Sequence, residues 1–572
     1  MNGPKTKYML HAPKHEADNS QVKMYLGNCE IERVDSFRCL GVILDDQLSF
    51  GAHVDQICAA ALKAIHASSA LFPQASAEMG LSIYSTKIRP HLERTYPVFC
   101  AGKRADVNKI ERIHRIALLR ATNTMSSTAT SALEVITHTK PIRIRLKEIL
   151  LQEHLRIKAM PYDNHLRQLI CTLSEDEKHL DTKILSPIHI VNMAIKDLAP
   201  DVNFESVDKI CPPSSERLNF TTPMVAKFMD NFGSANSRTT VQKELAKSHA
   251  VAQLNAIPSN ELVIFTDGSA LRNPGPCGAS AVCYHEGMDT EPTVLTKSVS
   301  PLGTSYLGEL CGLELATNHA RENIPTYTPT SIHIFCDCQS AIQSISTTNI
   351  HSSHQDIIDN ILRNITIIQK AGITVNLNWI AGHVKLQPNE IADENAKTAA
   401  ESAKEMERSS SHTSANLIKQ EIKQKSVEKW QNSWEKSDTG RWLFEFMPEV
   451  SEKRYHSNFP KPLETKLLRL LTGETRLKDN MYRFKFVDSP NCDCDRDRQT
   501  IEHVLLHCPL FSSAREKMIN SIEMTYCMKK TPSSERQLTM STLLAPNHKS
   551  HETRSCVLDA SLDFIDELPI NF

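Results

Sequence analysis

The segment Glu261-Leu-Val-Ile-Phe-Thr-Asp267 is apolar on both faces, which is typical of a strand buried in the middle of a sheet, and it ends in a carboxylate. The segment Ser331-Ile-His-Ile-Phe-Cys-Asp337 has the same design. If the two strands are neighbours, their terminal carboxylates lie about 5 Å apart, which is the spacing between strands. Two carboxylates so close must share a proton or bind a cation, and their hard oxygen atoms suit Mg²⁺ or Mn²⁺.

Two further acidic residues and one histidine lie where other elements are predicted to meet these strands. Glu309 begins a helical pattern whose face consists mostly of small residues, which lets a helix approach a sheet closely. Asp393 belongs to a second predicted helix, and Pro388 marks the first turn of that helix. Residues 373–379 alternate as a half-buried strand does and lead to His383. The histidine is therefore expected in a loop beside the carboxylates.

Taken singly, each of these residues has an ordinary structural interpretation, such as a strand-end cap, a surface helix residue or a loop residue. Taken in order, residues 256–402 resemble the type 1 ribonuclease H family. The segments that carry the resemblance are Thr266-Asp-Gly-Ser-Ala-Leu-Arg-Asn-Pro-Gly-Pro276, Gly308-Glu-Leu310, Cys336-Asp-Cys-Gln-Ser-Ala341, Gly382-His-Val384 and Asn389-Glu-Ile-Ala-Asp-Glu-Asn-Ala-Lys397.

This resemblance implies an α/β domain with a five-stranded mixed sheet and flanking helices, which hydrolyses the RNA strand of RNA/DNA hybrids with two Mg²⁺ (or Mn²⁺) ions. By the resemblance, Asp267 bridges both ions, Glu309 and Asp337 hold one of them, and Asp393 holds the other. One ion would then activate water while its partner stabilises the leaving 3′-oxygen. His383 would shuttle a proton or help product release, for which an ordinary pKa near 6.5 is suitable.

Other residues near these motifs match the family in part. Asn273 and Gln339 match positions that contact the hybrid in its minor groove, where the 2′-hydroxyl is recognised. Pro388 stands where the family commonly has glycine before the Asn389 position. Cys336 and Cys338 flank Asp337, and strand alternation predicts that both sulfur atoms point away from the carboxylate, as small core residues and not zinc ligands.

The distribution of charge separates the predicted catalytic domain from the N-terminal region. The whole chain is nearly neutral, with 65 Lys plus Arg against 67 Asp plus Glu. From Glu261 to Glu401 there are 7 basic and 15 acidic residues, so this domain is expected to bind a polyanion poorly by itself. Between Lys87 and Lys158 the counts are 15 basic and 6 acidic. That stretch is either a solvated helix face or a surface that follows nucleic-acid phosphates.

The N-terminal segments resemble the region that follows the catalytic palm in reverse transcriptases of non-LTR (LINE-like) retrotransposons. The resemblance covers about residues 2 to 155 and implies a helix-rich, thumb-like module over residues 1–160 that grips a duplex. DNA synthesis is not expected, because Asp45 and Asp46 fall inside the thumb-like match without the other polymerase ligands. The matching segments are Asn2-Gly-Pro-Lys-Thr-Lys-Tyr-Met9, Phe37-Arg-Cys-Leu-Gly-Val-Ile-Leu-Asp45 and Ile83-Tyr-Ser-Thr-Lys-Ile-Arg-Pro90.

Near the C-terminus, three cysteines and one histidine form a closed ligand set for structural Zn²⁺, namely Cys492, Cys494, His503 and Cys508. The first two cysteines are separated by one residue, which is fewer than usual, so reduced thiols without a metal are the alternative. The surrounding residues resemble the zinc-binding tail of the same retroelements. Tyr482, Phe484 and Phe486 alternate with basic residues, either as a stacking surface for single-stranded nucleic acid or as an ordinary strand.

At 572 residues the chain requires several folding units. Outside the regions already described, we expect a connector (161–255), a linker and helix with Trp430 and Trp434 (403–454), a zinc-binding-like unit (455–530) and a weakly structured tail (531–572). No apolar run approaches the roughly 20 residues of a membrane span. The 16 cysteines are interpreted as reduced intracellular thiols, and without a dense basic import tract the choice between nucleus and cytoplasm stays open.

These patterns predict a metal-dependent endonuclease that acts on RNA in hybrids, within a retroelement-derived protein. The alternative is a noncatalytic remnant that only binds nucleic acid. The complete set of four carboxylates favours the enzyme, because a remnant has no physical need to keep acids that repel one another. Cleavage of double-stranded RNA or DNA is a third possibility, and partnership with a separate polymerase stays open.

Overall fold

The chain folds into two compact units. The sheet unit comprises Gln152–Leu180 and Asp201–Ile422, and the helical unit comprises Met1–Leu151, Asp181–Pro200 and Lys423–Phe572. The computed structural model describes all residues except 1–5, 12–22, 162, 177–186, 209–219, 226–237, 328, 347–352, 408–412, 454, 457, 534–535, 547, 549 and 571.

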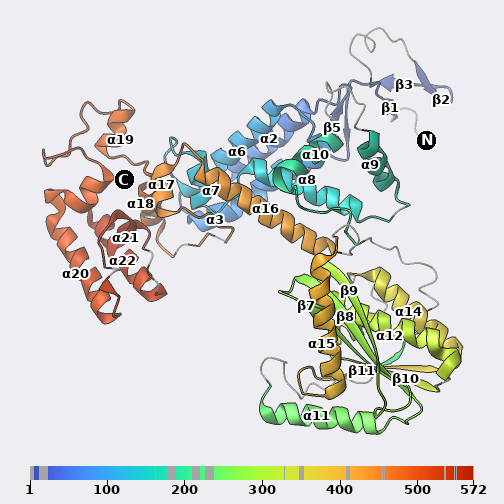
Figure 1. The fold of residues 1–572 in the computed structure, drawn as a ribbon. Helices are drawn as coiled ribbons and strands as arrows, with labels where there is room; N and C mark the ends of the chain where they lie inside the picture. The colour runs from blue at the N-terminus through green and yellow to red at the C-terminus, as the bar shows by residue number, and fades with distance from the viewer. Residues whose placement is uncertain are drawn as a thin grey trace. The chain divides into compact units, whose positions relative to one another are not determined.

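The sheet unit is built on a mixed sheet whose described strands follow the order β6-β11-β10-β7-β8-β9 (Figure 1). Strands β6, β11, β10 and β7 are parallel neighbours, whereas β7, β8 and β9 pair antiparallel. The five predicted strands are present, and a short sixth strand comes from the predicted connector. The strands are β6 (Met224–Val225), β7 (Leu262–Ala270), β8 (Gly275–Tyr284), β9 (Thr293–Gly303), β10 (Ser331–Cys336) and β11 (Thr374–Trp379).

The predicted adjacency of the two buried strands is confirmed. Strands β7 and β10 are parallel neighbours, and Cys336 pairs with Thr266, so Asp337 follows β10 next to Asp267. The expectation that the first strand ends at Asp267 was wrong, because β7 continues through Asp267 to Ala270. The continuation is held by pairing with β8, in which Asp267 lies opposite Ser280. Asp267 is therefore held by strand pairing with β8, one residue beyond the last pair between β7 and β10.

Helices cover both faces of this sheet. On one face, α12, α13 and α14 pack with residues such as Ile264 and Ile332, and on the other face α11 and α15 pack with Phe265 and Phe335. Helix α11 belongs to this core although its sequence lies in the predicted connector. The helices of the sheet unit are α9 (His165–Asp176), α11 (Thr240–Asn255), α12 (Ser305–Tyr327), α13 (Gln339–Ser346), α14 (Gln355–Lys370) and α15 (Gln387–Ser402).

Glycines bring the two central helices into main-chain contact with the sheet. A Cβ atom on Gly268 of β7 would lie 2.0 Å from the backbone nitrogen of Glu309, and a Cβ on Gly308 would lie 2.9 Å from the Cα of Gly268. On β8, a Cβ on Gly278 would lie 2.3 Å from the nitrogen of Ala400 in α15. The prediction that small residues let the helix of Glu309, α12, approach the sheet closely is confirmed.

The helical unit begins with short strands that precede a group of helices. Strands β1, β3 and β2 form one small sheet, and β4 pairs with β5. After β5, the Asp45 carboxylate accepts backbone hydrogen bonds from Ser49 and Phe50, which is a structural role in the turn before α2. The elements are β1 (Lys7–Tyr8), β2 (Met24–Leu26), β3 (Cys29–Arg33), β4 (Ser36–Cys39), β5 (Val42–Asp45), α2 (Gly51–Ala67), α3 (Ala77–Ile83), α4 (Arg89–Glu93), α5 (Tyr96–Phe99), α6 (Arg104–Thr122), α7 (Thr130–Ile136), α8 (Ile142–Lys158) and α10 (Pro187–Leu198).

The C-terminal helices share one hydrophobic core with these N-terminal helices. Trp430 and Trp434 are almost fully buried in it, together with Ala132 of α7 and Leu468 of α18. The predicted packing role of the two tryptophans is confirmed. The helices are α16 (Ala415–Glu435), α17 (Arg441–Phe446), α18 (Lys461–Thr472), α19 (Lys478–Arg483), α20 (Ser512–Met528), α21 (Met540–Leu544) and α22 (His551–Glu567).

Two expectations for the C-terminal region were wrong. The described part of residues 531–572 is not weakly structured, because α22 has apolar residues three or four positions apart and buries them in the core. The buried apolar residues of α22 are Val557, Ala560, Leu562, Phe564 and Ile565. The alternating aromatics do not form a strand either, since Tyr482 lies in α19 and Phe484 and Phe486 follow that helix in a turn.

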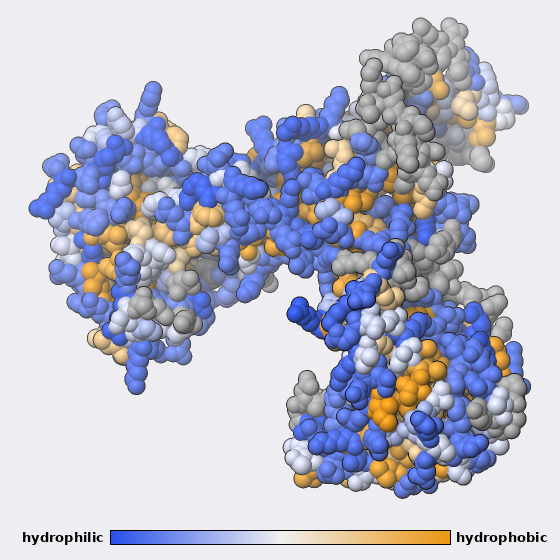
Figure 2. Space-filling view, viewed as in Figure 1, coloured by the Kyte–Doolittle hydropathy of each residue, from blue (hydrophilic) through white to orange (hydrophobic). Residues whose placement is uncertain are grey.

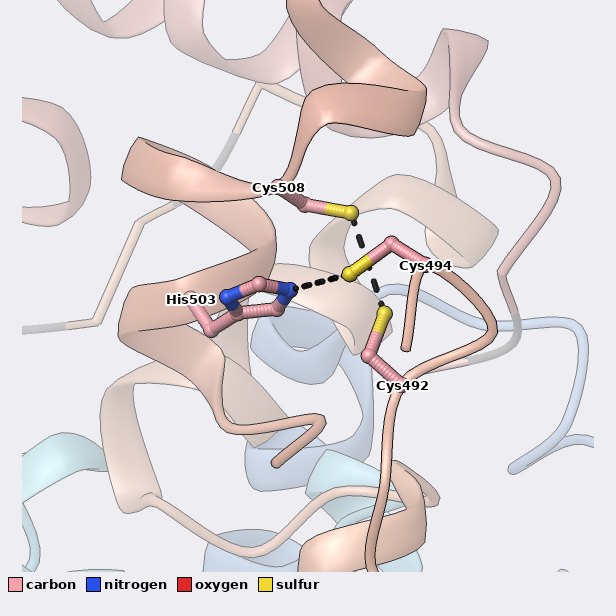
Figure 3. Close-up of side chains that lie close together, drawn as sticks. All are labelled: Cys492, Cys494, His503 and Cys508. Atoms are coloured by element: carbon pink, nitrogen blue, oxygen red, sulfur yellow. Dashed lines mark hydrogen bonds between the residues drawn. The ribbon is translucent and has the colours of Figure 1, made fainter. Parts of the chain in front are cut away.

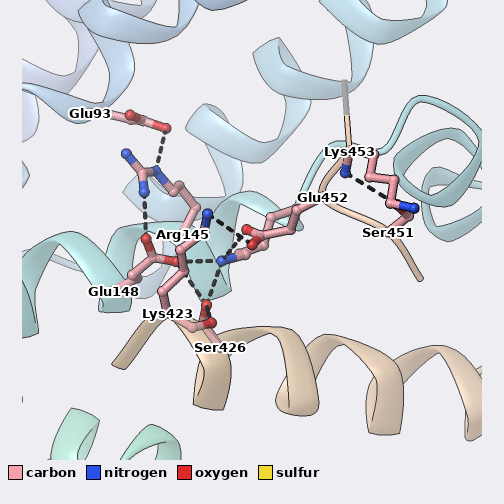
Figure 4. A network of polar contacts seen from close by, with 9 residues as sticks. Glu93, Arg145, Glu148, Lys423, Ser426, Ser451, Glu452 and Lys453 are labelled. Atoms are coloured by element: carbon pink, nitrogen blue, oxygen red, sulfur yellow. Dashed lines mark hydrogen bonds and ion pairs between the residues drawn. The ribbon is translucent and has the colours of Figure 1, made fainter. Parts of the chain in front are cut away.

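A buried polar network joins α8 to α16 within the helical unit (Figure 4). The ammonium group of Lys140 contacts the carboxylates of Glu148 and Glu452 and the hydroxyl of Ser426. Arg145 donates to Glu148 at 2.6 Å and reaches Glu93 at 3.4 Å. Each buried charge in this network has a partner of opposite charge, and we therefore interpret the network as structural.

No described helix combines the length and the apolar character that a membrane span requires. The face of the molecule in Figure 2 is predominantly hydrophilic. Each cysteine that the structure describes is free of disulfide bonds.

Candidate active site

The fold brings three of the four predicted acidic residues together. One carboxylate oxygen each from Asp267, Glu309 and Asp337 lies within 4.8 Å of the others. Asp267 comes from β7, Glu309 from the second turn of α12, and Asp337 from the bend after β10. Asp267 and Glu309 are buried, and Asp337 is half-buried. We refer to these three side chains as the acidic cluster.

Burial and mutual repulsion raise the pKa values throughout the acidic cluster. The pKa of Asp267 rises to about 8 because of burial, with further contributions from the charges of Asp337 and Asp393. Burial likewise raises the pKa of Glu309 well above its usual range. For Asp337, burial raises the pKa while the charge of His383 opposes the rise. A donor set of oxygens with this much uncompensated charge fits a hard divalent cation such as Mg²⁺.

Asp393 lies beside the acidic cluster but is not one of its members. Its charge contributes to the raised pKa values of Asp267 and Asp337. Its Oδ2 atom lies 2.5 Å from the Nζ atom of Lys397, one turn later in α15. The motif that ends at Lys397 assigned no role to this residue, although the four-residue spacing on a helix was a signal for this ion pair.

His383 occupies an exposed turn between β11 and α15, as the sequence predicts. Its φ angle is +58°, and that of Lys385 is +59°, so two residues with side chains adopt the left-handed conformation in this turn. A Cβ atom on Gly382 would lie 2.2 Å from Oδ2 of Asp337, so the main chain of the turn rests against this carboxylate. We refer to residues 380–386 as the histidine turn.

An arginine that the sequence analysis did not identify also reaches the histidine turn. The Nη1 atom of Arg238 donates a hydrogen bond to the backbone oxygen of Gly382 at 2.7 Å. Its charge also opposes the raised pKa of Asp337. Arg238 lies in a stretch with little periodicity, and no motif in the sequence pointed to it.

The two predicted contacts with nucleic acid have different surroundings. Asn273 makes two hydrogen bonds with Ser305, the first residue of α12. The Nδ2 atom of Asn273 donates to Ser305 Oγ at 3.0 Å, and its Oδ1 atom accepts from the Ser305 backbone nitrogen at 3.3 Å. This pair holds the helix that carries Glu309. Gln339 is the first residue of α13 and is half-buried near Asp337. A role for either residue in nucleic-acid binding stays a prediction.

The prediction for the thiols beside Asp337 needs one correction. Cys336 is a buried core residue as expected, but its Sγ atom lies 3.5 Å from Oε2 of Glu309 and so points toward the acidic cluster. The alternation argument fails because β10 ends at Cys336 and Asp337 lies in a bend. Cys338 is half-buried, and its sulfur lies 3.2 Å from the hydroxyl of Ser340.

The predicted zinc ligands also lie together, in the helical unit (Figure 3). One ligand atom each from Cys492, Cys494, His503 and Cys508 lies within 4.8 Å of the others. The sulfur atoms of Cys492 and Cys508 are 3.7 Å apart, and Cys494 Sγ lies 3.2 Å from His503 Nε2. We refer to these four residues as the Cys/His cluster.

Comparisons with known proteins give matches that fall within the sheet unit. The RNase H family model matches residues 259–401. Ribonuclease HI of Vibrio parahaemolyticus serotype O3:K6 is 32% identical over 146 residues, which cover 24% of this chain and 88% of the relative. Ribonuclease H of Blochmanniella pennsylvanica is 24% identical over 149 residues, covering 24% and 92%. The crystal structure of RNase H1 from Halobacterium salinarum NRC-1 is 18% identical, covers 25% of this chain and 99% of its own, and gives a TM-score of 0.20.

Proposed function

Because the chain belongs to the ribonuclease H family through residues 259–401, we propose that it is a metal-dependent endonuclease that hydrolyses the RNA strand of RNA/DNA hybrids. The observation that carries the proposal is the acidic cluster, whose three carboxylate oxygens lie within 4.8 Å of one another. A noncatalytic remnant has no physical need to maintain this repulsion. The family membership and the cluster together support hydrolysis over binding alone.

The residues have separate roles in the proposed reaction. Asp267, Glu309 and Asp337 would hold one Mg²⁺ (or Mn²⁺), and Asp267 with Asp393 would hold a second. The two ions would supply Lewis-acid polarisation of the phosphate and lower the pKa of water. Lys397 pairs with Asp393 and has to release that carboxylate when it binds a cation. His383 would accept or return a proton at the exposed side of the site.

A cleavage assay with four labelled substrates, made from three kinds of duplex, tests the proposed substrate. The full-length protein is incubated with end-labelled RNA/DNA hybrid, double-stranded RNA and double-stranded DNA of one sequence, and with a hybrid labelled on its DNA strand, in Mg²⁺ or Mn²⁺. We expect cuts in the RNA strand of the hybrid and none when EDTA replaces the metal. Binding of the hybrid without cleavage at any metal concentration would favour the noncatalytic alternative, and cleavage of another duplex would change the substrate class.

A retroelement origin belongs to the same proposal. It is supported by the order of the segments, in which sequences resembling a reverse-transcriptase thumb precede residues 259–401 and a Cys/His cluster follows them. The sheet unit is acidic over Glu261–Glu401, so affinity for nucleic acid has to come from other residues. In the helical unit, α6 exposes Arg112 and Arg120, which lie about 12 Å apart along the helix axis.

Replacing both of these arginines tests the contribution of α6. We expect the Arg112→Ala/Arg120→Ala variant to reduce the slope of log affinity against log salt by about 2, because each arginine neutralises about one phosphate. The affinity for the hybrid is measured in Ca²⁺ in place of Mg²⁺, so that the hybrid is bound without being cleaved. The control is Lys243→Ala/Lys419→Ala, which removes two exposed cations from the sheet unit. Equal slopes for both double variants would contradict the role of α6.

We further propose that the Cys/His cluster holds a structural Zn²⁺. Zinc–sulfur bonds of 2.3 Å in a tetrahedron place two sulfurs about 3.8 Å apart, whereas a disulfide places them about 2.05 Å apart. The observed separation of 3.7 Å between Cys492 and Cys508 supports the first arrangement. Burial and the neighbouring Cys492 raise the pKa of Cys508 to about 11, so this thiol needs a cation to become a thiolate near neutral pH.

Removing the metal tests this site through stability. We expect purified protein to contain about one zinc per chain, and Cys492→Ser to lose the metal and lower the melting temperature by at least about 5 °C, because structural zinc contributes folding free energy. Cys527→Ser is the matched control, since Cys527 is exposed and outside the cluster. A zinc-free protein that melts at the same temperature as the zinc-loaded protein would contradict the proposal.

A further inference from the structure

Arg238 connects α11 to the active site of the sheet unit. The residue is half-buried, and its Nη1 atom lies 2.7 Å from the backbone oxygen of Gly382. Gly382 is the neighbour of His383 and lies so close to Asp337 that a Cβ atom would contact its carboxylate at 2.2 Å. A single guanidinium group thus holds the main chain that lies between the predicted proton carrier and a predicted metal ligand.

The position of Arg238 is fixed by the helix that follows it. Thr239 and Gln242 form a reciprocal cap at the start of α11, with Thr239 N donating to Gln242 Oε1 at 2.8 Å and Gln242 N donating to Thr239 Oγ1 at 3.3 Å. Further along α11, Ala246 and Ala250 are buried in the same core as Ala381 of the histidine turn. Helix and turn are therefore parts of one packed layer.

The histidine turn needs support from outside. His383 and Lys385 both adopt positive φ angles, which are unfavourable for residues with side chains. Such a conformation persists only where surrounding contacts determine it. The core contacts of Ile380, Ala381 and Val384 hold the apolar side of the turn, and Arg238 holds a carbonyl on its polar side.

We propose that Arg238 is a positioning residue of the active site, which holds the histidine turn so that His383 stays beside Asp337. This inference rests on the proposed function. It extends the working catalytic domain to Arg238, beyond the N-terminal limit of residues 259–401 that match the family. Arg238 acts through the turn and does not contact the reacting groups.

Steady-state kinetics separate positioning from substrate binding. For Arg238→Ala in the full-length protein we expect kcat for the hybrid to fall about 10-fold while KM changes less than about 2-fold, because misplacing a catalytic group slows the reaction without removing a substrate contact. Arg238→Lys keeps one donor and is expected to recover part of the loss. The control is Lys243→Ala, which removes an exposed cation one turn later in α11 and should behave as the wild type.

A double-mutant cycle tests whether Arg238 acts through His383. In a His383→Ala background, adding Arg238→Ala should change kcat by less than about 2-fold, because the group that the arginine positions is already absent. If the two effects multiply, Arg238 acts independently of His383 and the proposal is overturned.

Amide hydrogen exchange in EDTA gives a readout that does not depend on activity. We expect Arg238→Ala to speed exchange of residues 381–386 by at least about 5-fold and to leave α11 unchanged, because only the support of the turn is lost. Unchanged exchange in the turn would overturn the proposal. Faster exchange in both α11 and the turn would also overturn it, since Arg238 would then stabilise the helix itself. These outcomes apply even if the wild-type protein does not cleave hybrids, so failure of the inference and failure of the proposed function are distinguishable.

Discussion

Replacing Asp267 with asparagine is expected to slow cleavage of the RNA/DNA hybrid by at least about 10³-fold, which corresponds to roughly 4 kcal/mol of transition-state stabilisation. Asp267 belongs to the acidic cluster and is also affected by the charge of Asp393, so its carboxylate is placed to serve both proposed metal positions. An amide has a similar shape but provides no charge. The rate is measured under single-turnover conditions in saturating Mg²⁺.

The matched control for this substitution is Asp289→Asn. Asp289 is exposed in the loop between β8 and β9, outside the acidic cluster, and the same chemical change there should leave the rate within about 2-fold of wild type. Comparable activity of Asp267→Asn and Asp289→Asn would rule out the acidic cluster as the site of hydrolysis.

The second large effect concerns the stability of the metal-free protein against pH. The pKa of Asp267 is about 8 in the folded protein and 3.8 in the unfolded chain. Between pH 3.8 and about pH 8 the folded state therefore keeps a proton that the unfolded state has released. The free energy of unfolding therefore falls as the pH rises from about 4 to about 8, by an amount on the order of 6 kcal/mol at about 1.36 kcal/mol for each pH unit. The raised pKa values of Glu309 and Asp337 act in the same direction.

Calorimetric melting in EDTA, with and without excess Mg²⁺, measures this effect. We expect Mg²⁺ to raise the melting temperature more at pH 9 than at pH 6, because the cation binds the deprotonated carboxylates. The Asp337→Asn variant should show a weaker pH dependence and higher metal-free stability at pH 9, since one repelling charge is gone. A metal-free melting temperature that does not differ between wild type and Asp337→Asn at any pH would contradict the assignment.

Much of the catalytic domain was predictable because its signals are local and periodic. The repeated design of 261–267 and 331–337 predicts two buried neighbouring strands, and their register places Asp267 next to Asp337. The small residues that follow Glu309 predict the close helix that brings this carboxylate to the strands. Such features depend on side-chain spacing, which a sequence displays directly.

Other features depended on contacts between distant segments, and the sequence did not reveal them. Strand β6 has two residues, too few for a periodic pattern. Arg238 is defined by a single bond to a carbonyl far along the chain, for which no residue pattern exists. The direction of the Cys336 sulfur was predicted incorrectly because alternation stops where the strand ends. By contrast, the apolar residues of α22 recur three or four positions apart, which is a helical signal that the sequence contains.

The contact between Gly268 and Gly308 determines how this site tolerates change. At this contact the main chain of β7 packs directly against the main chain of α12. As long as both glycines are kept, main-chain atoms therefore determine how close the backbone of Asp267 lies to that of Glu309. The interior of the domain can thus diverge in sequence while this main-chain contact between strand and helix is kept.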